Sequence, residues 1–157
     1  MEALERKEKA LSLLKEHAPN FQTYTQYPFD ADQTYLHQFS AQIKKDIIIS
    51  TFSAGSGHPG GSLSSVEMMS TLYTKHLRHR PQEPKWEGRD FVLFSKGHVS
   101  PLLYSLFVET GYYDRSLLAS FRTLGCPFQG HPASSRLDAV EVSSGSLGQG
   151  LSVGVGL

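Results

Sequence analysis

The chain has 157 residues, enough for one domain with a sizeable core, and 39% of them are hydrophobic, as in ordinary globular proteins. Lys and Arg number 15, as do Asp and Glu, so a net charge of zero gives no electrostatic reason to expect binding to nucleic acid or to an anionic membrane. The single cysteine, Cys126, cannot form an internal disulfide, and the absence of a Cys-x-x-Cys pair argues against a structural zinc site, so we expect an intracellular, cytoplasmic protein.

Residues 1–39 are predicted to form an N-terminal extension made of a helix and an arm. Leu11 and Leu14 recur at helical spacing among Glu and Lys, which predicts a helix over residues 1–18. Residues 20–35 are rich in aromatic side chains but have no clear period. We expect an extended arm that lays these aromatics on a surface, with a loosely ordered extension as the alternative.

Two further helices are predicted on either side of a glycine-rich loop. An apolar stripe predicts a helix over residues 38–54, and Gly55 is suited to cap its C-terminal end. The loop that follows, Ser56-Gly-His-Pro-Gly-Gly-Ser62, exposes backbone N–H groups and the imidazole of His58. The sequence Ser64-Ser-Val-Glu67 matches a capping box and predicts a third helix through about Leu77.

A short apolar run at residues 91–94 is bounded by polar residues, which is typical of a buried parallel strand. Residues 140–142 form a second strand candidate, and a helix is predicted from His98 to about Glu109. We therefore expect an α/β fold over residues 40–157, with a parallel sheet flanked by helices. Ligands bind at the carboxyl ends of strands in such sheets, which would place His98 where chemistry usually lies.

Three remaining features complete the predicted elements. His76 and His79 lie three residues apart; one interpretation is a metal-binding pair, and we favour two surface histidines. Asp114 is predicted to cap a helix through about Leu124. Residues 147–157 form a glycine-rich helix candidate. Glycine at that density disfavours an isolated helix, and it makes sense where another backbone or a ligand must come very close.

Three loop histidines, His58, His98 and His131, each lie next to or near glycine. One interpretation is a zinc site with three histidine ligands, although no H-x-x-x-H or H-x-H pair anchors a metal. The other, which we favour, is a shared site in which the imidazoles bind oxygen-rich groups and move protons near neutral pH.

A fourth loop, Gly145-Ser-Leu-Gly-Gln-Gly150, is the better candidate for binding phosphate. A glycine turn before a helix presents unpaired N–H groups and the positive end of the helix dipole. Because the loop contains no lysine or arginine, a diphosphate bound there would need a divalent cation as counter-charge. Gly55-Ser-Gly-His-Pro-Gly60 spells G-x-G-x-x-G, but a predicted helix precedes it instead of a strand, which argues against dinucleotide binding.

Taken together, these motifs resemble the N-terminal, thiamine diphosphate-binding region of transketolases. Order and spacing follow the family from about residue 40 to the end, in stretches that include Ser56-Gly-His-Pro-Gly-Gly-Ser62, Ser95-Lys-Gly-His98, Gly130-His-Pro132 and Gly145-Ser-Leu-Gly-Gln-Gly-Leu151. Ser146 replaces the proline of the long single-chain enzymes. The chain is therefore most similar to the N-terminal subunit of split transketolases, in which two polypeptides share the enzyme.

The resemblance implies transfer of a two-carbon ketol unit from a ketose phosphate to an aldose phosphate, with thiamine diphosphate and Mg²⁺ or Ca²⁺ as cofactors. It implies that His58 contacts substrate hydroxyls and assists proton transfer. His98 would touch the cofactor diphosphate and line the substrate channel, and His131 would bind substrate oxygens near the reactive carbon of the thiamine. The segment that would lie along the thiamine comprises Gly145, Ser146 and Leu147.

The resemblance also implies a partner. The family's Gly-Asp-Gly metal motif would follow Leu157, and its catalytic glutamate belongs to a pyrimidine-binding domain. We therefore expect an oligomer with a C-terminal transketolase subunit or domain that carries the pyrimidine-binding site, and no turnover by this chain alone. The alternative is a non-catalytic, truncated paralogue that binds a full-length partner and modulates its assembly.

Overall fold

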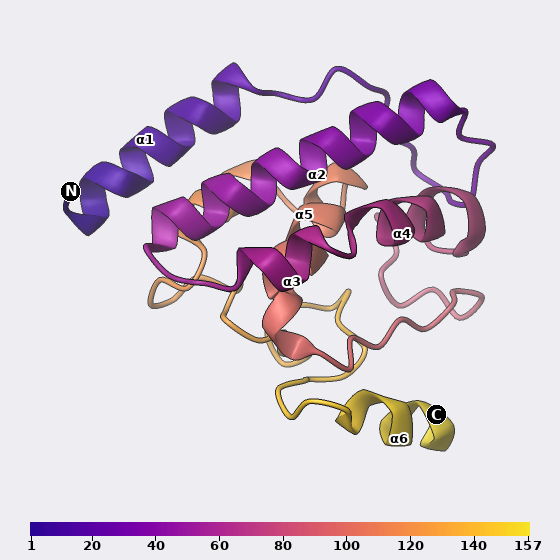
Figure 1. Ribbon diagram of the computed structural model, residues 1–157. Helices are drawn as coiled ribbons and strands as arrows, with labels where there is room; N and C mark the ends of the chain where they lie inside the picture. The colour runs from indigo at the N-terminus through magenta and orange to yellow at the C-terminus, as the bar shows by residue number, and fades with distance from the viewer.

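The computed structural model describes residues 1–157 and is built from helices and loops (Figure 1). No helix is long and apolar enough to cross a membrane. The α-helices are α1 (Ala3–Glu16), α2 (Gln33–Ala54), α3 (Pro59–Leu63), α4 (Val66–Thr71), α5 (Ser100–Glu109) and α6 (Gln149–Gly156). Three other turns of helix are the π-helical η1 (Leu72–His76) and the 3₁₀-helical η2 (Gly97–Val99) and η3 (Arg115–Ser120).

The predicted parallel sheet is absent, and the α/β expectation was therefore wrong. The only β-type pairing is an isolated antiparallel bridge between Tyr27 and His79. Residues 91–94 and 140–142 are not strands, and residues 91–94 take part in no backbone hydrogen bond. Phe91 is also half exposed. A strand exists only where a neighbour pairs with its N–H and C=O groups, and an apolar run in the sequence does not show that such a neighbour is present.

The longest helix, α2, has well-defined caps at both ends. The Asp32 carboxylate accepts a hydrogen bond from the backbone N–H of Tyr35 at 2.7 Å, so the helix begins earlier than predicted. At the other end, Gly55 adopts the left-handed conformation with a φ of 62°, and its N–H donates to the carbonyl of Phe52. Glycine is favoured there because it has no Cβ, and this end of the helix is confirmed.

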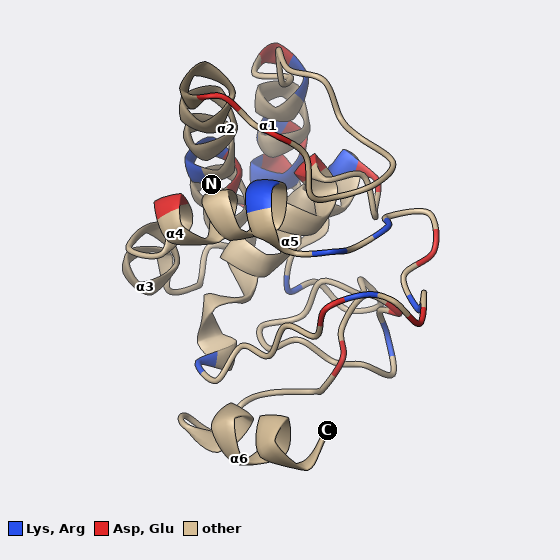
Figure 2. Cartoon of the chain, turned by 90° about the vertical axis from the view of Figure 1, so that its right-hand side faces the viewer, with Lys and Arg blue, Asp and Glu red and all other residues tan.

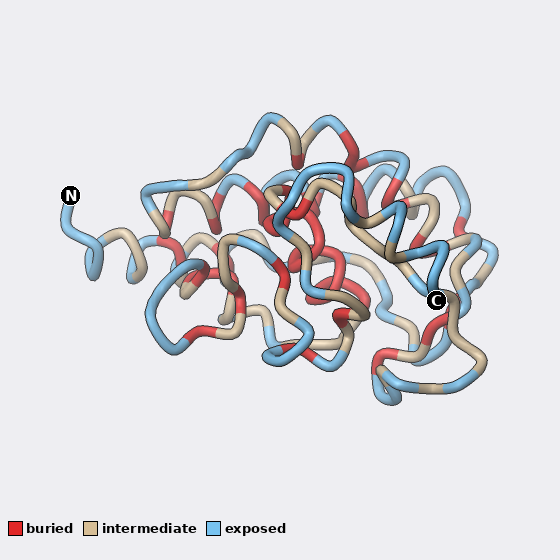
Figure 3. Tube along the Cα trace, turned by 90° about the horizontal axis from the view of Figure 1, so that it is seen from below, coloured by how far each residue is buried: buried red, intermediate tan, exposed pale blue.

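One hydrophobic core lies between α1, α2, α5 and η3, and Figure 3 shows the buried chain running through the centre of the molecule. Every residue of α5 is buried, as expected for a helix that other elements surround on all sides. The predicted helices α1 and α5 are both confirmed, and Ala10 and Leu14 place α1 on the core. The largest fully buried side chains include Phe39, Ile43, Leu102, Tyr104, Phe121 and Phe128.

The segment between α1 and α2 lies against η1 and the loop after it. The backbone N–H of Tyr27 donates to the carbonyl of His79 at 3.0 Å, and that of Phe29 donates to the carbonyl of Thr74 at 2.9 Å. Tyr24 stacks on Phe29 with ring centroids 3.9 Å apart. The aromatic side chains of this arm therefore pack on one another and on the folded chain.

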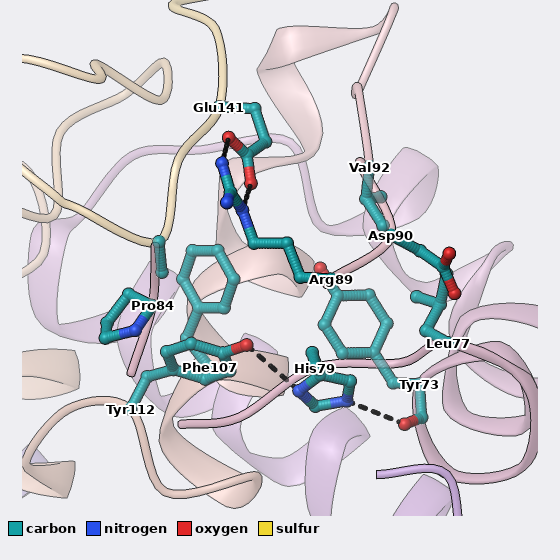
Figure 4. Close-up of a pocket in the computed structure, with 11 residues that line it drawn as sticks. Tyr73, Leu77, His79, Pro84, Arg89, Asp90, Val92, Phe107, Tyr112 and Glu141 are labelled. Atoms are coloured by element: carbon teal, nitrogen blue, oxygen red, sulfur yellow. Dashed lines mark hydrogen bonds and ion pairs between the residues drawn. The ribbon is translucent and has the colours of Figure 1, made fainter. Parts of the chain in front are cut away.

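His79 is buried, which corrects its interpretation as a surface residue; His76 is exposed. Figure 4 shows the imidazole between two oxygen atoms: Nε2 lies 2.9 Å from the carbonyl of Tyr73, and Nδ1 lies 2.9 Å from the hydroxyl of Tyr112. A carbonyl can only accept, so Nε2 carries the proton and Nδ1 accepts from Tyr112. Burial lowers the pKa of His79 to about 4, so the ring is neutral at pH 7.

The helix predicted after residue 64 differs from the expectation in two ways. A short helix, α3, already begins at Pro59, which is favoured at the first position of a helix. The predicted capping box is not formed: the hydroxyl of Ser64 donates to the carbonyl of Gly61, and Ser65, which precedes α4, makes no capping hydrogen bond. By contrast, the cap at Asp114 is confirmed: its carboxylate accepts from the N–H of Ser116, although the helix there is 3₁₀ and ends at Ser120.

The C-terminal helix α6 stands apart from the other helices and has no buried residue (Figures 1 and 2). Figure 2 also shows that it carries no charged side chain. Its N-cap residue is Gly148, whose φ of 90° favours glycine. The glycine-rich helix predicted for this part of the chain is thus formed, and its first turn lies against Ser95 through Gly150.

Candidate functional site

Two of the predicted site histidines lie side by side. The rings of His58 and His98 meet edge to face, with their centroids 5.6 Å apart. His58 is exposed and immediately precedes α3, whereas His98 is half-buried within η2. Two loops that are forty residues apart in the chain therefore present a pair of imidazoles on the same side of the molecule.

His131 borders the glycine-rich segment that starts at Gly145. The N–H of Ser144 donates to the carbonyl of Pro132 at 3.2 Å, which fixes the two loops against each other. A Cβ built on Gly145 would lie 3.9 Å from the Cδ2 atom of His131, an ordinary contact distance. His131 and Gly145 are both exposed, so this corner of the site is open to solvent.

Residues 95–100 connect these two groups. The Ser100 hydroxyl donates to the carbonyl of Gly130 at 2.8 Å, next to His131, and the N–H of Gly148 donates to the carbonyl of Ser95 at 2.9 Å. At Gly97 a Cβ would lie only 2.9 Å from the backbone carbonyl of Ser144, so only glycine allows this approach. The segment that carries His98 is thus the point at which the other three loops meet.

The glycines of the last loop fall into two kinds. A Cβ on Gly150 would lie 2.8 Å from the Cα of Ser95, which confirms the expectation that another backbone comes very close here. No atom lies within 4 Å of the corresponding position on Gly148. The segment Gly145, Ser146 and Leu147 is exposed throughout, and 74% of Leu147 is accessible. One side of the loop is therefore packed on Ser95, and the other is free to receive a ligand.

No group of three or more His, Cys, Asp or Glu side chains in the chain could hold a metal ion. The three-histidine zinc site considered from the sequence is therefore not formed. What remains is an open surface with imidazoles, backbone groups and the N-terminal end of α6, an eight-residue helix. Such a surface suits an anionic or hydroxyl-rich small molecule.

One site residue that carried no role in the sequence analysis is Lys96. Its ammonium group donates to the hydroxyl of Ser65 at 2.7 Å and to the carbonyl of Gly61 at 3.3 Å. The sequence signal that could have identified Lys96 was its position, two residues before His98 in Ser95-Lys-Gly-His98. Its partners could not be inferred, because Gly61 and Ser65 lie on the other side of a long polar loop.

The pocket around His79 in Figure 4 is a separate feature. Arg89 donates from Nε and Nη2 to the two carboxylate oxygens of Glu141, at 2.6 and 2.9 Å. The ring nitrogens of His79 are likewise occupied by Tyr73 and Tyr112. These polar groups satisfy one another, which indicates a structural network and leaves residues 95–100 as the centre of the candidate site.

Comparison with known proteins shows the family of the chain. Residues 41–157 match the family model described as "Transketolase, thiamine diphosphate binding domain". Transketolase-like protein 2 of Bos taurus is 38% identical over 135 residues, which cover 81% of this chain and 21% of that protein. Transketolase 1 of Aliivibrio fischeri is 42% identical over 106 residues, covering 66% of this chain and 16% of that protein.

Solved structures agree with these relatives. The transketolase of Campylobacter jejuni superposes with a TM-score of 0.74 and 39% identity, over 80% of this chain and 20% of that one. The transketolase of Leishmania mexicana gives a TM-score of 0.71 and 33% identity, over 77% and 18%. The chain belongs to the transketolase family, in its thiamine diphosphate-binding region. It spans about a fifth of the length of these relatives.

Proposed function

We propose that this chain forms the diphosphate-binding part of a thiamine diphosphate-dependent enzyme that transfers a two-carbon ketol unit from a ketose phosphate to an aldose phosphate. In this proposal residues 40–157 are the diphosphate-binding domain and residues 1–39 an extension. The observation that carries it is the meeting of the loops of His58, His131 and Gly145 on residues 95–100, which carry His98. Membership of the transketolase family supplies the reaction class.

The residues of the site fit thiamine diphosphate. Open space at Gly148, and room at Gly145 beside His131, would let a flat ring approach the backbone, and the exposed side chain of Leu147 offers it an apolar contact. His98 and the N-terminal end of α6 are suited to the diphosphate. Gly145, Ser146, Leu147 and His98 would therefore hold the cofactor, which when bound supplies the carbanion chemistry of ketol transfer.

The exposed imidazoles serve the substrate in this proposal. His58 stands at the open edge of the site beside His98, where its ring nitrogens can hydrogen-bond sugar hydroxyls and accept or return a proton. His131, beside Gly145, is placed to hydrogen-bond oxygen atoms of a substrate bound next to the cofactor. A histidine suits both tasks because its ring exchanges protons near neutral pH.

Two components of the proposed enzyme come from outside these residues. The chain has no group of side chains that could hold the Mg²⁺ or Ca²⁺ that the diphosphate needs as counter-charge. We propose that the metal ligands and the pyrimidine-binding site belong to a C-terminal transketolase domain or subunit, as in a split transketolase, and that the two parts form a cytoplasmic oligomer.

The direct test is a reconstituted assay. The chain, joined to or mixed with a C-terminal transketolase part that carries the metal motif and the pyrimidine site, is supplied with thiamine diphosphate, Mg²⁺ and common ketose phosphates. Ketol transfer to an aldose phosphate is expected in this mixture, and a matched mixture without the chain serves as control. If no ketose phosphate is consumed, the proposed function is wrong.

The first mutational prediction concerns His131. In the reconstituted enzyme, His131→Ala should lower kcat by about 10²- to 10⁴-fold, the range for loss of a proton-transferring or hydrogen-bonding imidazole. The fold should be unaffected, because the side chain is exposed. Steady-state kinetics together with a thermal unfolding curve checks both statements. His37→Ala, another exposed histidine on α2, is the matched control, and equal kcat in the two variants would remove the role given to His131.

The second mutational prediction concerns Gly145. Valine is tolerated in the free chain, since φ at Gly145 is not in the left-handed region and the nearest atom to a Cβ lies 3.9 Å away. The added methyl groups would nevertheless fill the space assigned to the cofactor ring. Calorimetric titration of the reconstituted enzyme with thiamine diphosphate and Mg²⁺ should show at least about a tenfold loss of affinity. Gly156→Val, also in open space, is the control, and unchanged affinity for Gly145→Val would contradict the assignment.

A further inference from the structure

The loop that carries His58 has few hydrogen bonds to distant parts of the chain. Residues 55–65 make local hydrogen bonds within the loop, α3 and the adjoining helices. The only hydrogen bonds that join them to a distant segment come from the Lys96 ammonium, which donates to the carbonyl of Gly61 and to the hydroxyl of Ser65. Ser62 is buried and Leu63 packs on the core, so packing also holds α3, and Lys96 supplies the hydrogen bonds that tie it to a distant segment.

The turn η2, which contains His98 and Val99, also contacts α3 through packing. A Cβ built on Gly61 would lie 3.6 Å from Nε2 of His98 and 3.5 Å from Cγ1 of Val99. The backbone of Gly61 thus lies against the His98 ring. Its carbonyl oxygen accepts a hydrogen bond from Lys96, which precedes His98 by two residues. Residues 96–99 therefore hold one residue of α3 by a hydrogen bond and by direct contact, and they bring His58 to the edge of His98.

The chemistry of the lysine fits this task. Ser65 is buried and Lys96 is half-buried, so the ammonium has lost part of its water and needs oxygen partners. Ser65 is the residue at the start of α4 and makes no capping hydrogen bond, so its hydroxyl is available to accept from Lys96. One cation thus links the middle of α3 to the residue that precedes α4.

We propose that Lys96 is a positioning residue that acts through His58: it holds α3 against His98 so that the two imidazoles face the substrate as a pair. The consequence for turnover rests on the proposed function, whereas the effect on the two rings is a property of the chain itself. Loss of the ammonium should release α3, with His58 leaving its place beside His98, and should leave the core between α1, α2 and α5 intact.

The first experiment measures the ring contact by nuclear magnetic resonance in the full chain. Cross-relaxation between ring protons of His58 and His98 is expected in the parent, reduced at least about threefold in Lys96→Met and largely kept in Lys96→Arg, which retains the charge and the donors. Lys45→Met, at an exposed lysine on α2 that makes no hydrogen bond or ion pair, is the matched control. An unchanged ring contact in Lys96→Met would overturn the inference.

The second experiment is a double-mutant cycle in the reconstituted enzyme. If Lys96 acts through His58, then Lys96→Met and His58→Ala should each lower kcat/KM by about tenfold or more, and the double variant should lose little beyond the larger single effect. Independent roles would give losses that multiply, and that result would also overturn the inference. If the parent enzyme shows no ketol transfer, the proposed function is wrong. The cross-relaxation between the rings of His58 and His98 would still test the role of Lys96.

Thermal unfolding of the same variants separates positioning from support of the whole fold. Lys96→Met and the shorter polar variant Lys96→Gln are expected to unfold within a few degrees of the parent, since the buried core does not include Lys96. If both variants are unfolded at room temperature, the inference is wrong, because the lysine then supports the fold in general.

Discussion

Replacing Arg115 with methionine is expected to lower the free energy of unfolding by about 3–5 kcal/mol, the usual cost of removing one partner from a buried ion pair. The guanidinium donates to carboxyl oxygens of Asp46 and Glu109, whose side chains are almost completely buried. It also donates to the backbone carbonyls of Leu14 and His17 at 3.4 Å. Without it, two carboxyl groups stay in the core without a cation, and the end of α1 loses two donors.

Equilibrium unfolding in urea, monitored by circular dichroism, measures this loss. Methionine approximates the length of the arginine stem, so the change isolates the guanidinium. Arg136→Met is the matched control, because Arg136 is exposed and its side chain makes no hydrogen bond or ion pair; it should change stability by less than about 0.5 kcal/mol. Equal unfolding midpoints for Arg115→Met and the control would show that the cluster of Asp46, Glu109 and Arg115 does not stabilise the fold.

The same cluster predicts that the contribution of Glu109 to stability falls as the pH rises. Burial, reinforced by the neighbouring Asp46 carboxylate, raises the pKa of Glu109 to about 9 from an ordinary value of 4.5. Between these two pH values the folded state binds more protons than the unfolded state, so stability falls as the pH increases. The stability from a protonated Glu109 is fully present below pH 4.5 and is lost as the pH rises to about 9, by at most about 1.4 kcal/mol per unit.

Glu109→Gln removes this titration while keeping the size of the side chain and an oxygen that can accept from Arg115. The difference in unfolding free energy between the variant and the parent should therefore favour the variant increasingly from pH 5 to pH 9. Urea unfolding at several pH values measures it. Glu8→Gln, at an exposed position on α1, is the control and should run parallel to the parent. A constant difference for Glu109→Gln would show that Glu109 is already ionised at neutral pH.

Local sequence signals were sufficient for much of the helical framework. Gly55 ends α2 and Asp114 caps η3, because each of these effects depends only on one residue and its immediate neighbours. The apolar spacing in α1 and the apolar composition of α5 likewise report which helices face the core. The apolar run at residues 91–94 was misleading, because its interpretation as a strand depended on a partner elsewhere in the chain.

The candidate site shows the same distinction between local sequence signals and contacts between distant segments. The glycine and histidine loops could be recognised from residue types alone, and the need for a close backbone approach at Gly150 could be inferred from glycine density. Which loops meet, and where, depends on contacts between distant segments, such as Ser100 with Gly130 and Gly97 with Ser144. The burial of His79 had the same origin, because Tyr27 stacks on its ring and Tyr112 hydrogen-bonds its Nδ1 atom.

The two kinds of glycine in the site loops have a consequence for natural and laboratory variation. At Gly97 and Gly150 any side chain would collide with a neighbouring backbone, so a selection for folded protein alone should already reject substitutions there. At Gly145 a side chain has room in the free chain, so the same selection should accept alanine or serine, and only a selection for growth that requires the proposed ketol transfer should remove them. Comparing the two selections position by position would separate the glycines that build this protein from those that serve its ligand.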